Sequence, residues 1–284
     1  MRALRLTLLL TATFTVVEFA GGLLTGSLAL LADAAHMLSD NVSLGVALFA
    51  GWLATRPAGP DRTFGYRRAE ILAALFNGVT LVAISIWIFV EAINRFRDVP
   101  DVDAGPMLAV AAGGLAINIA AAAILSRHSE ESLNVSAALR HVIADLLGSV
   151  GVIIAATVIL ITGWEYADPV VGVLIGLLVL ASSWGILRDS AQILLEASPA
   201  GIDVQQVGRA MAGMPHVSEV HDLHVWTITS GFPALAAHVL VGRDADCHAA
   251  RRDLEAMLHE RFGLDHTTLQ VDHVGGDLLQ IEGT

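Results

Sequence analysis

A chain of 284 residues could hold two soluble domains, but 55% of its residues are hydrophobic and only 15% are charged, which indicates a membrane protein. Its formal net charge of -12 argues against nucleic acid as a partner and favours cations. A single cysteine, Cys247, excludes a disulfide framework and a cysteine-based zinc ribbon.

Six apolar stretches each reach the ~20 residues that a membrane-crossing helix needs. The first follows Arg2 and Arg5, as in a signal peptide, but it is long for a signal sequence and similar stretches follow it, so we interpret it as a span. Asp168 followed by Pro169 predicts a capped start for the last span. The predicted spans cover residues 4–24, 28–55, 69–93, 105–126, 133–162 and 168–188.

Arginines gather in the loops at one end of these spans. With the N-terminus inside, nine of the arginines in and between the spans lie on the cytoplasmic side and only two, Arg95 and Arg97, lie outside. The positive-inside rule therefore predicts that both termini are cytoplasmic.

Residues 196–284 differ from the apolar body, because they hold 13 of the 28 acidic residues and 8 of the 11 histidines. Their pattern predicts an αββαβ order, which forms a small sheet with helices on one face. We therefore expect a six-span domain, 1–195, and a cytoplasmic α+β domain, 196–284, whose small size favours pairing with a second copy. The expected helices are 203–214 and 246–262, and the expected strands are 217–229, 233–241 and 266–274.

Two predicted spans each carry a His and an Asp four residues apart: His36 with Asp40, and His141 with Asp145. This spacing places both side chains on one helix face, and ionisable groups at membrane depth rarely persist without partners. The two spans run in opposite directions, so the pairs can meet as two imidazoles and two carboxylates. Such a set suits tetrahedral zinc better than magnesium, calcium or copper(I). The alternative is that each side chain is satisfied locally.

Other polar residues lie within the predicted spans. Asp33 shares a helix face with His36, so it either supports the metal ligands or holds protons; alternatively, it is a carboxylate near the outer mouth. Glu18 and Asn118 are expected to pack or gate and not to bind metal.

Three sequence runs resemble the cation diffusion facilitator family. They are LADAAHMLSD at 31–40, FGYRRAE at 64–70 and HVIADLLGSVG at 141–151, and the predicted αββαβ tail fits as well. The resemblance implies a six-span homodimer that exchanges metal for protons, with the two His–Asp pairs as the transport site. A His and an Asp in both spans is similar to the zinc-preferring branch. Short loops favour a bacterial exporter of the inner membrane, and loop 56–68, which has no His, is expected to hold no metal.

The resemblance also assigns roles in the tail. His221, His238 and Asp272 match metal-binding positions of the family's cytoplasmic domain, and His248 is a further candidate. Gln270 stands where some relatives have a histidine, so one or two tail metals are both open. Arg68 and Glu196 match a charge pair between bundle and tail; the alternative is two solvated charges.

The leading hypothesis is a secondary transporter that exports Zn²⁺ and imports protons as counter-ions, with zinc also a possible regulatory ligand of the tail. An enzyme is not expected, because the only His-Glu pair, His259-Glu260, has Gly263 where a zinc metalloprotease needs a second His. The chain also has no phosphate-binding loop of the GxxxxGK type. The alternatives are a membrane-bound metal sensor and a broader zinc, cadmium and cobalt transporter.

Overall fold

The computed structural model describes residues 2–54, 56–126 and 133–275. In three of the helices further side chains, among them those of Asp40 and of residues 2–6 and 133–141, also lie outside the described part. The chain forms two compact units: Met1–Trp52 with Ala73–Arg188, and Leu53–Leu72 with Asp189–Thr284. The first unit is a helical bundle, and the second contains the tail together with the loop between the second and third helices.

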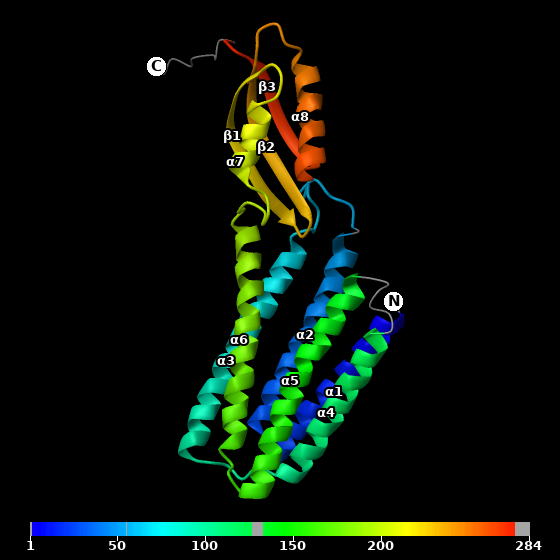
Figure 1. Cartoon of the computed structure of the whole chain (residues 1–284), viewed down its shortest axis with the longest axis vertical. Helices are drawn as coiled ribbons and strands as arrows, with labels where there is room; N and C mark the ends of the chain where they lie inside the picture. Colours follow the sequence, from blue (N-terminus) through cyan, green and yellow to red (C-terminus); the bar gives the residue numbers. More distant parts are fainter. Residues whose placement is uncertain (1, 55, 127–132, 276–284) are drawn as a thin grey trace. The chain divides into compact units, whose positions relative to one another are not determined.

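Six apolar helices make up the body of the chain, as the apolar stretches predict (Figure 1). Five of them contain a described stretch long and apolar enough to cross a membrane, whereas in the second helix the described apolar stretch is shorter, Leu28–Ser39. The sixth helix continues well beyond its predicted end at 188. The helices are α1 Arg2–Thr25, α2 Leu28–Ala54, α3 Ala69–Arg97, α4 Ala104–Ser126, α5 Leu133–Thr162 and α6 Ala167–Leu194.

Asp168 does not cap its own helix, which corrects the prediction from the Asp-Pro pair. Helix α6 begins at Ala167, and the fully buried Asp168 carboxylate accepts hydrogen bonds from the backbone N–H groups of Leu28 and Ala29 at 2.7 and 3.1 Å. It also accepts from Ser27 Oγ at 2.6 Å and lies 3.2 Å from Arg95 Nη1. The orphan N–H groups and the positive end of the α2 dipole attract the carboxylate, so α6 caps α2.

The tail has the predicted αββαβ order. Strand β1 pairs antiparallel with β2, and β2 pairs parallel with β3 through the crossover helix α8. Asp203 and Asp246 cap the two tail helices at their N-termini, and Gly263, with φ at 65°, ends α8 in the left-handed conformation that glycine adopts without strain. The elements are α7 Val204–Ala212, β1 Val217–Thr229, β2 Phe232–Val241, α8 Cys247–Phe262 and β3 His266–His273.

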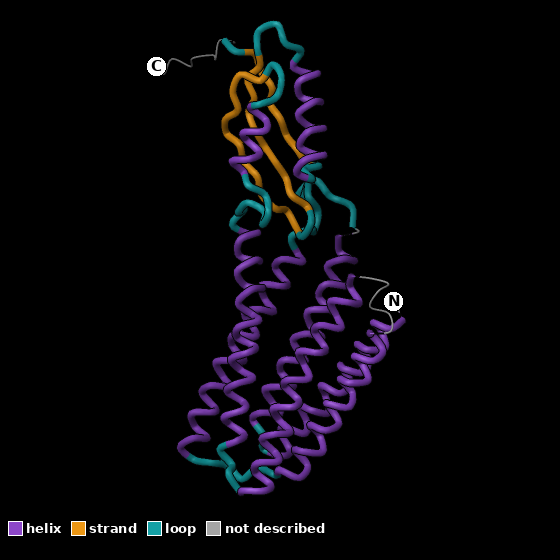
Figure 2. The backbone as a smooth tube through the Cα atoms, in the orientation of Figure 1, coloured by secondary structure: helices purple, strands orange, loops and turns teal. Residues whose placement is uncertain are grey.

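Both tail helices cover the same face of the sheet (Figure 2). Val207 and Met211 of α7 and Leu254 and Leu258 of α8 share one core with alternate residues of β2, among them Leu235, Ala237 and Val239. The intervening residues Ala236 and His238 therefore face the other side of the sheet, because side chains alternate along a strand. This second face carries His238 together with its ladder partners His221 and Gln270.

Candidate metal centre

Helices α2 and α5 lie side by side and run in opposite directions (Figure 1), and they bring together one residue from each predicted His–Asp pair. His36 Nε2 lies 3.6 Å from Asp145 Oδ1, with side-chain exposures of 21% and 7%. Asp40 and His141 belong to the same helices, but their side chains lie outside the described part.

The register between α2 and α5 is defined by a second contact on the same faces. Asp33 packs against Gly148 so closely that a Cβ atom at Gly148 would lie 2.2 Å from Asp33 Oδ1. The two contacts agree in register, because the helices are antiparallel. His36 lies three residues after Asp33 in α2, and Asp145 lies three residues before Gly148 in α5. The four-residue repeat then sets Asp40 and His141 at the next matching positions of the two helix backbones.

The distance from His36 to Asp145 can be compared with two kinds of interaction. A direct N–H···O hydrogen bond spans about 2.7–3.2 Å. Two ligand atoms bound to one tetrahedral zinc at bond lengths of about 2.0–2.1 Å lie about 3.3–3.4 Å apart. The observed 3.6 Å is closer to the separation of two ligands that share a metal ion.

Polar side chains from four helices extend this site on the side of Asp33. Asn118 of α4 donates to Ser149 of α5, and Ser149 donates to Asp33, each at 3.4 Å. The fully buried Glu18 of α1 lies beside Asp33, and Asp145 is close enough to interact with Glu18 electrostatically. The sequence showed that these residues were polar and within spans, but not that they converge.

The sheet of the tail aligns two of its predicted ligands. His221 lies opposite His238 in the β1–β2 ladder, with ring centroids 5.4 Å apart, and His238 lies opposite Gln270 in the β2–β3 ladder. Gln270 donates a hydrogen bond to Asp272 at 2.8 Å, so Asp272 lies beside this row, two residues further along β3.

His248 lies apart from that row. It lines a pocket with Leu269 and Val271, whose side chains join the core on the helix-covered face of the sheet. Among the side chains that the structure describes, which exclude those of Asp40 and His141, no group of three or more His, Cys, Asp and Glu is gathered closely enough to hold a metal ion. The tail metal site therefore stays a prediction, with His221 and His238 as the pair that one chain brings together.

Asp222 is a residue of this polar face that the sequence reasoning missed. It lies in a bulge of β1 with φ at 53°, and its carboxylate is 2.8 Å from His224 Nε2. The hydrogen bond and the charge of His224, with smaller effects of His238 and His221, hold the pKa of Asp222 below its usual value. The run His-Asp-Leu-His at 221–224 was the available signal.

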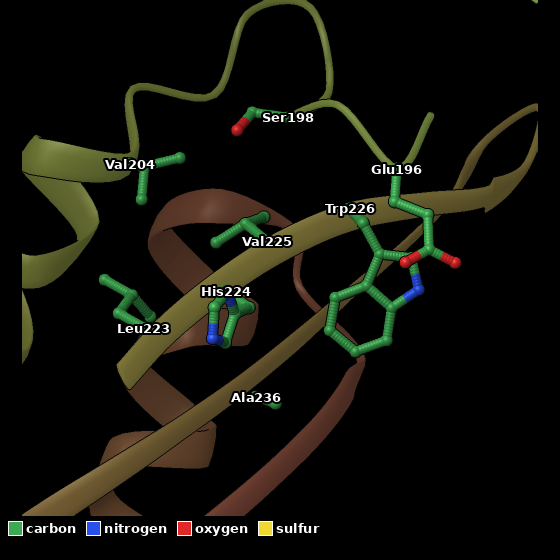
Figure 3. A pocket seen from close by; sticks show the side chains of 8 residues that line it. All are labelled: Glu196, Ser198, Val204, Leu223, His224, Val225, Trp226 and Ala236. Atoms are coloured by element: carbon green, nitrogen blue, oxygen red, sulfur yellow. The ribbon is translucent and has the colours of Figure 1, made fainter. Parts of the chain in front are cut away.

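The predicted charge pair at the base of the tail is formed in the second unit. Arg68 Nη2 lies 2.8 Å from Glu196 Oε1, and both side chains are largely solvent-exposed. Glu196 also lines a pocket of about 480 Å³ with His224 and Trp226, where its carboxylate lies beside the indole (Figure 3). Glu70, from the same sequence run as Arg68, accepts a hydrogen bond from Thr229 Oγ1 at 3.1 Å.

Known proteins match nearly the whole chain. The family model described as the cation efflux transmembrane domain matches residues 4–195, and the model described as the cation efflux protein cytoplasmic domain matches residues 199–274. A Bacillus subtilis protein described as a cadmium, cobalt and zinc/H(+)-K(+) antiporter is 41% identical over 275 residues, covering 95% of this chain and 88% of the relative.

Two further relatives are similar over comparable lengths. The metal cation efflux system protein CzcD of Cupriavidus metallidurans is 43% identical over 274 residues, covering 95% of this chain and 86% of the relative. The zinc transporter ZitB of Escherichia coli is 44% identical over 265 residues, covering 93% of this chain and 84% of the relative.

Proposed function

This chain belongs to the cation diffusion facilitator, or cation efflux, family of transporters, and from that premise we propose that it carries Zn²⁺ out of the cytoplasm in exchange for protons. The proposed transport site consists of His36, Asp40, His141 and Asp145. Asp33 supports this site from the neighbouring turn of α2.

One observation carries the proposal: the register in which α2 and α5 pair His36 with Asp145 at 3.6 Å. Since His and Asp are four residues apart in both helices, the same register brings Asp40 and His141 to matching backbone positions. Two imidazole nitrogens and two carboxylate oxygens then complete a tetrahedral donor set, which is the preferred geometry of zinc.

Proton exchange follows from the chemistry of these ligands. Imidazole and carboxylate groups bind metal in their deprotonated forms, so zinc that enters the site displaces the protons held there. A site that opens to the cytoplasm exchanges protons for zinc, and the same site opened to a more acidic exterior exchanges zinc for protons. Alternating access of one site to the two sides is sufficient for antiport.

The same proposal places the bundle in the bacterial inner membrane with both termini in the cytoplasm, because nine of the arginines in and between the helices then lie inside. It also divides the chain into a transport domain, 1–195, and a metal-binding and dimerisation domain, 196–284, which pairs two copies. In the tail, His221, His238 and Asp272, on the polar face of the sheet, bind regulatory zinc.

The ligand assignment is tested by zinc flux into proteoliposomes containing the full chain. We expect Asp40→Ala and His141→Ala each to abolish flux while the protein remains folded and dimeric, since loss of one ligand in four requires water to enter a poorly hydrated site. Asp98→Ala, which removes an exposed carboxylate beyond α3, is the matched control. Flux near the parent rate in either ligand variant would refute the four-ligand site.

The antiport is tested in everted vesicles with an acidic lumen. We expect zinc entry to slow sharply when a protonophore and a potassium ionophore collapse the gradient, and zinc binding to the purified protein to release protons. Equal flux without a gradient, together with no proton release, would leave a facilitated zinc channel as the better account.

A broader cation selectivity is the second candidate, and the name of the Bacillus subtilis relative favours it. Cadmium and cobalt also accept nitrogen and oxygen ligands in a tetrahedron. The same proteoliposomes distinguish the two cases when zinc, cadmium and cobalt are compared at equal concentrations.

A further inference from the structure

The loop between α2 and α3 is strongly basic in a chain that is acidic overall. Residues 56–68 contain four arginines and one acidic residue, Asp61, whereas the whole chain has a net charge of -12. The Arg68–Glu196 pair uses one of these arginines. The zinc proposal gives the other three, Arg56, Arg62 and Arg67, no role.

Two of these arginines line a pocket of about 320 Å³ between the loop and one end of the tail sheet. The Arg67 guanidinium lies over the Phe232 ring at 4.2 Å from its centroid. The His266 ring stands between Phe232 and Phe64, at centroid distances of 5.4 and 5.8 Å. The described residues that line the pocket include no acidic side chain: Arg56, Ala58, Thr63, Phe64, Gly65, Arg67, Phe232 and His266.

This lining favours one class of ligand. A guanidinium presents several N–H donors in one plane and binds phosphate oxygens through two of them. Stacking on Phe232 holds the plane of Arg67, so less side-chain freedom is lost when an anion binds. A cation that entered the pocket would meet two guanidinium groups and no acidic side chain among the described lining residues. The pocket volume is at the lower end of the range for ligand sites, which fits a headgroup.

The position of the arginines in the chain indicates where such an anion would come from. Arg56 follows the last residue of α2, Ala54, by two positions, and Arg67 precedes the first residue of α3, Ala69, by two positions. Because both helices cross the membrane, chain connectivity keeps these two arginines near the lipid headgroups. Clusters of basic residues directly cytoplasmic of a membrane helix attract anionic phospholipids.

We propose that the pocket formed by Arg56, Arg67, Phe232 and His266 binds the phosphate of an anionic phospholipid. The bound headgroup bridges the α2–α3 loop and the tail sheet beside the Arg68–Glu196 pair. A soluble phosphate has the same recognition chemistry, and the experiment separates the two sources.

The test measures lipid binding to the purified full-length protein in detergent by native mass spectrometry, with phosphatidylglycerol and phosphatidylcholine as probes. We expect the parent to retain phosphatidylglycerol selectively. We expect Arg56→Gln and Arg67→Gln each to weaken that retention about fivefold, and the double variant about 25-fold. Arg67→Lys keeps the charge but loses the planar fork, so it should fall between parent and Arg67→Gln.

Arg97→Gln is the matched control, because Arg97 is an exposed arginine at the other end of α3. Since Arg56 is exposed, Arg56→Gln is expected to fold normally and keeps the test informative if Arg67→Gln is unstable.

Retention of phosphatidylglycerol that is unaffected by millimolar inorganic phosphate supports the lipid as the source of the bound phosphate. Displacement of lipid by phosphate supports the soluble source. Equal retention in parent and double variant, or an equal loss in Arg97→Gln, would overturn the proposal. Because the readout is binding and not flux, it is independent of zinc transport.

Discussion

Replacing Gly148 with alanine tests whether the close contact of α2 and α5 builds the proposed transport site. Gly148 faces Asp33, and a Cβ atom there would lie 2.2 Å from Asp33 Oδ1 and 3.1 Å from Asp33 Cγ. Ordinary contact begins at 3.4 Å, so the two groups must separate by about 1.2 Å, the difference between 3.4 and 2.2 Å. Asp33 is only 1% exposed and has little room to turn away.

The cost of this clash can be estimated from overpacked cores, where an added methyl typically costs about 1–3 kcal/mol. If α2 and α5 move apart to relieve it, the gap between His36 and Asp145, now 3.6 Å, widens one turn away. Metal–ligand distances tolerate deviations of only about 0.2 Å. A strain of about 1–3 kcal/mol that falls on the binding geometry lowers zinc affinity by about 5- to 150-fold.

The assay combines zinc affinity of the purified full chain, zinc flux in proteoliposomes and the midpoint of thermal unfolding. The control is Gly185→Ala in α6, where an added Cβ has no atom within 4 Å. We expect Gly148→Ala to lower all three quantities and Gly185→Ala to leave them near the parent values. If the two variants behave alike, the close approach at Gly148 does not shape the site.

Three further predictions concern the cap that Asp168 provides for α2, the proposed metal site of the tail and the cap that Asp246 provides for α8. Asp168→Ala should lower the free energy of unfolding by about 3–5 kcal/mol in chemical denaturation, since it leaves the buried N–H groups of Leu28 and Ala29 without their acceptor and removes one of the carboxylates that Arg95 contacts; a loss no larger than that of the exposed Asp98→Ala would contradict this. His238→Ala should reduce the zinc bound per full-length protomer but leave slower residual flux, because the tail acts on rates from a distance; a folded variant with no flux would assign His238 to the transport path. Backbone N–H groups of Ala249 and His248 hold the pKa of Asp246 below its usual value, so its stabilising effect is full above about pH 4 and is lost as pH falls through the lowered pKa. The midpoint of thermal unfolding should therefore be lower for Asp246→Ala than for Asp244→Ala at pH 7, and this difference should shrink at pH 3. A difference that stays constant between the two pH values would refute the cap.

The helices and strands of this chain were predictable because their signals are local. Apolar runs of membrane length mark the helices of the bundle, and alternation between turn residues marks β1, β2 and β3 within one or two residues. The spacing of His36 from Asp40 and of His141 from Asp145 is likewise a property of one helix at a time. It selects the candidate ligands without reference to any neighbour.

Contacts between elements required the tertiary structure. An Asp before a Pro can cap its own helix or a neighbouring one. Asp168 caps α2 because the N-termini of α2 and α6 lie side by side, which the sequence does not reveal. Strict alternation would put His221 and His224 on opposite faces of β1, but the bulge at Asp222 puts both on the polar face. His248 shares its residue type with the proposed ligands, yet α8 directs it to the other side of the sheet.

The proposed transport site combines both kinds of information. The sequence by itself selected four candidate zinc ligands and assigned two of them to each of two predicted helices. The pairing of His36 with Asp145 was decided by the packing of α2 on α5, because the register of two helices depends on contacts such as Asp33 with Gly148. Those contacts join residues more than a hundred positions apart, and helical periodicity carries no information about neighbours at that distance.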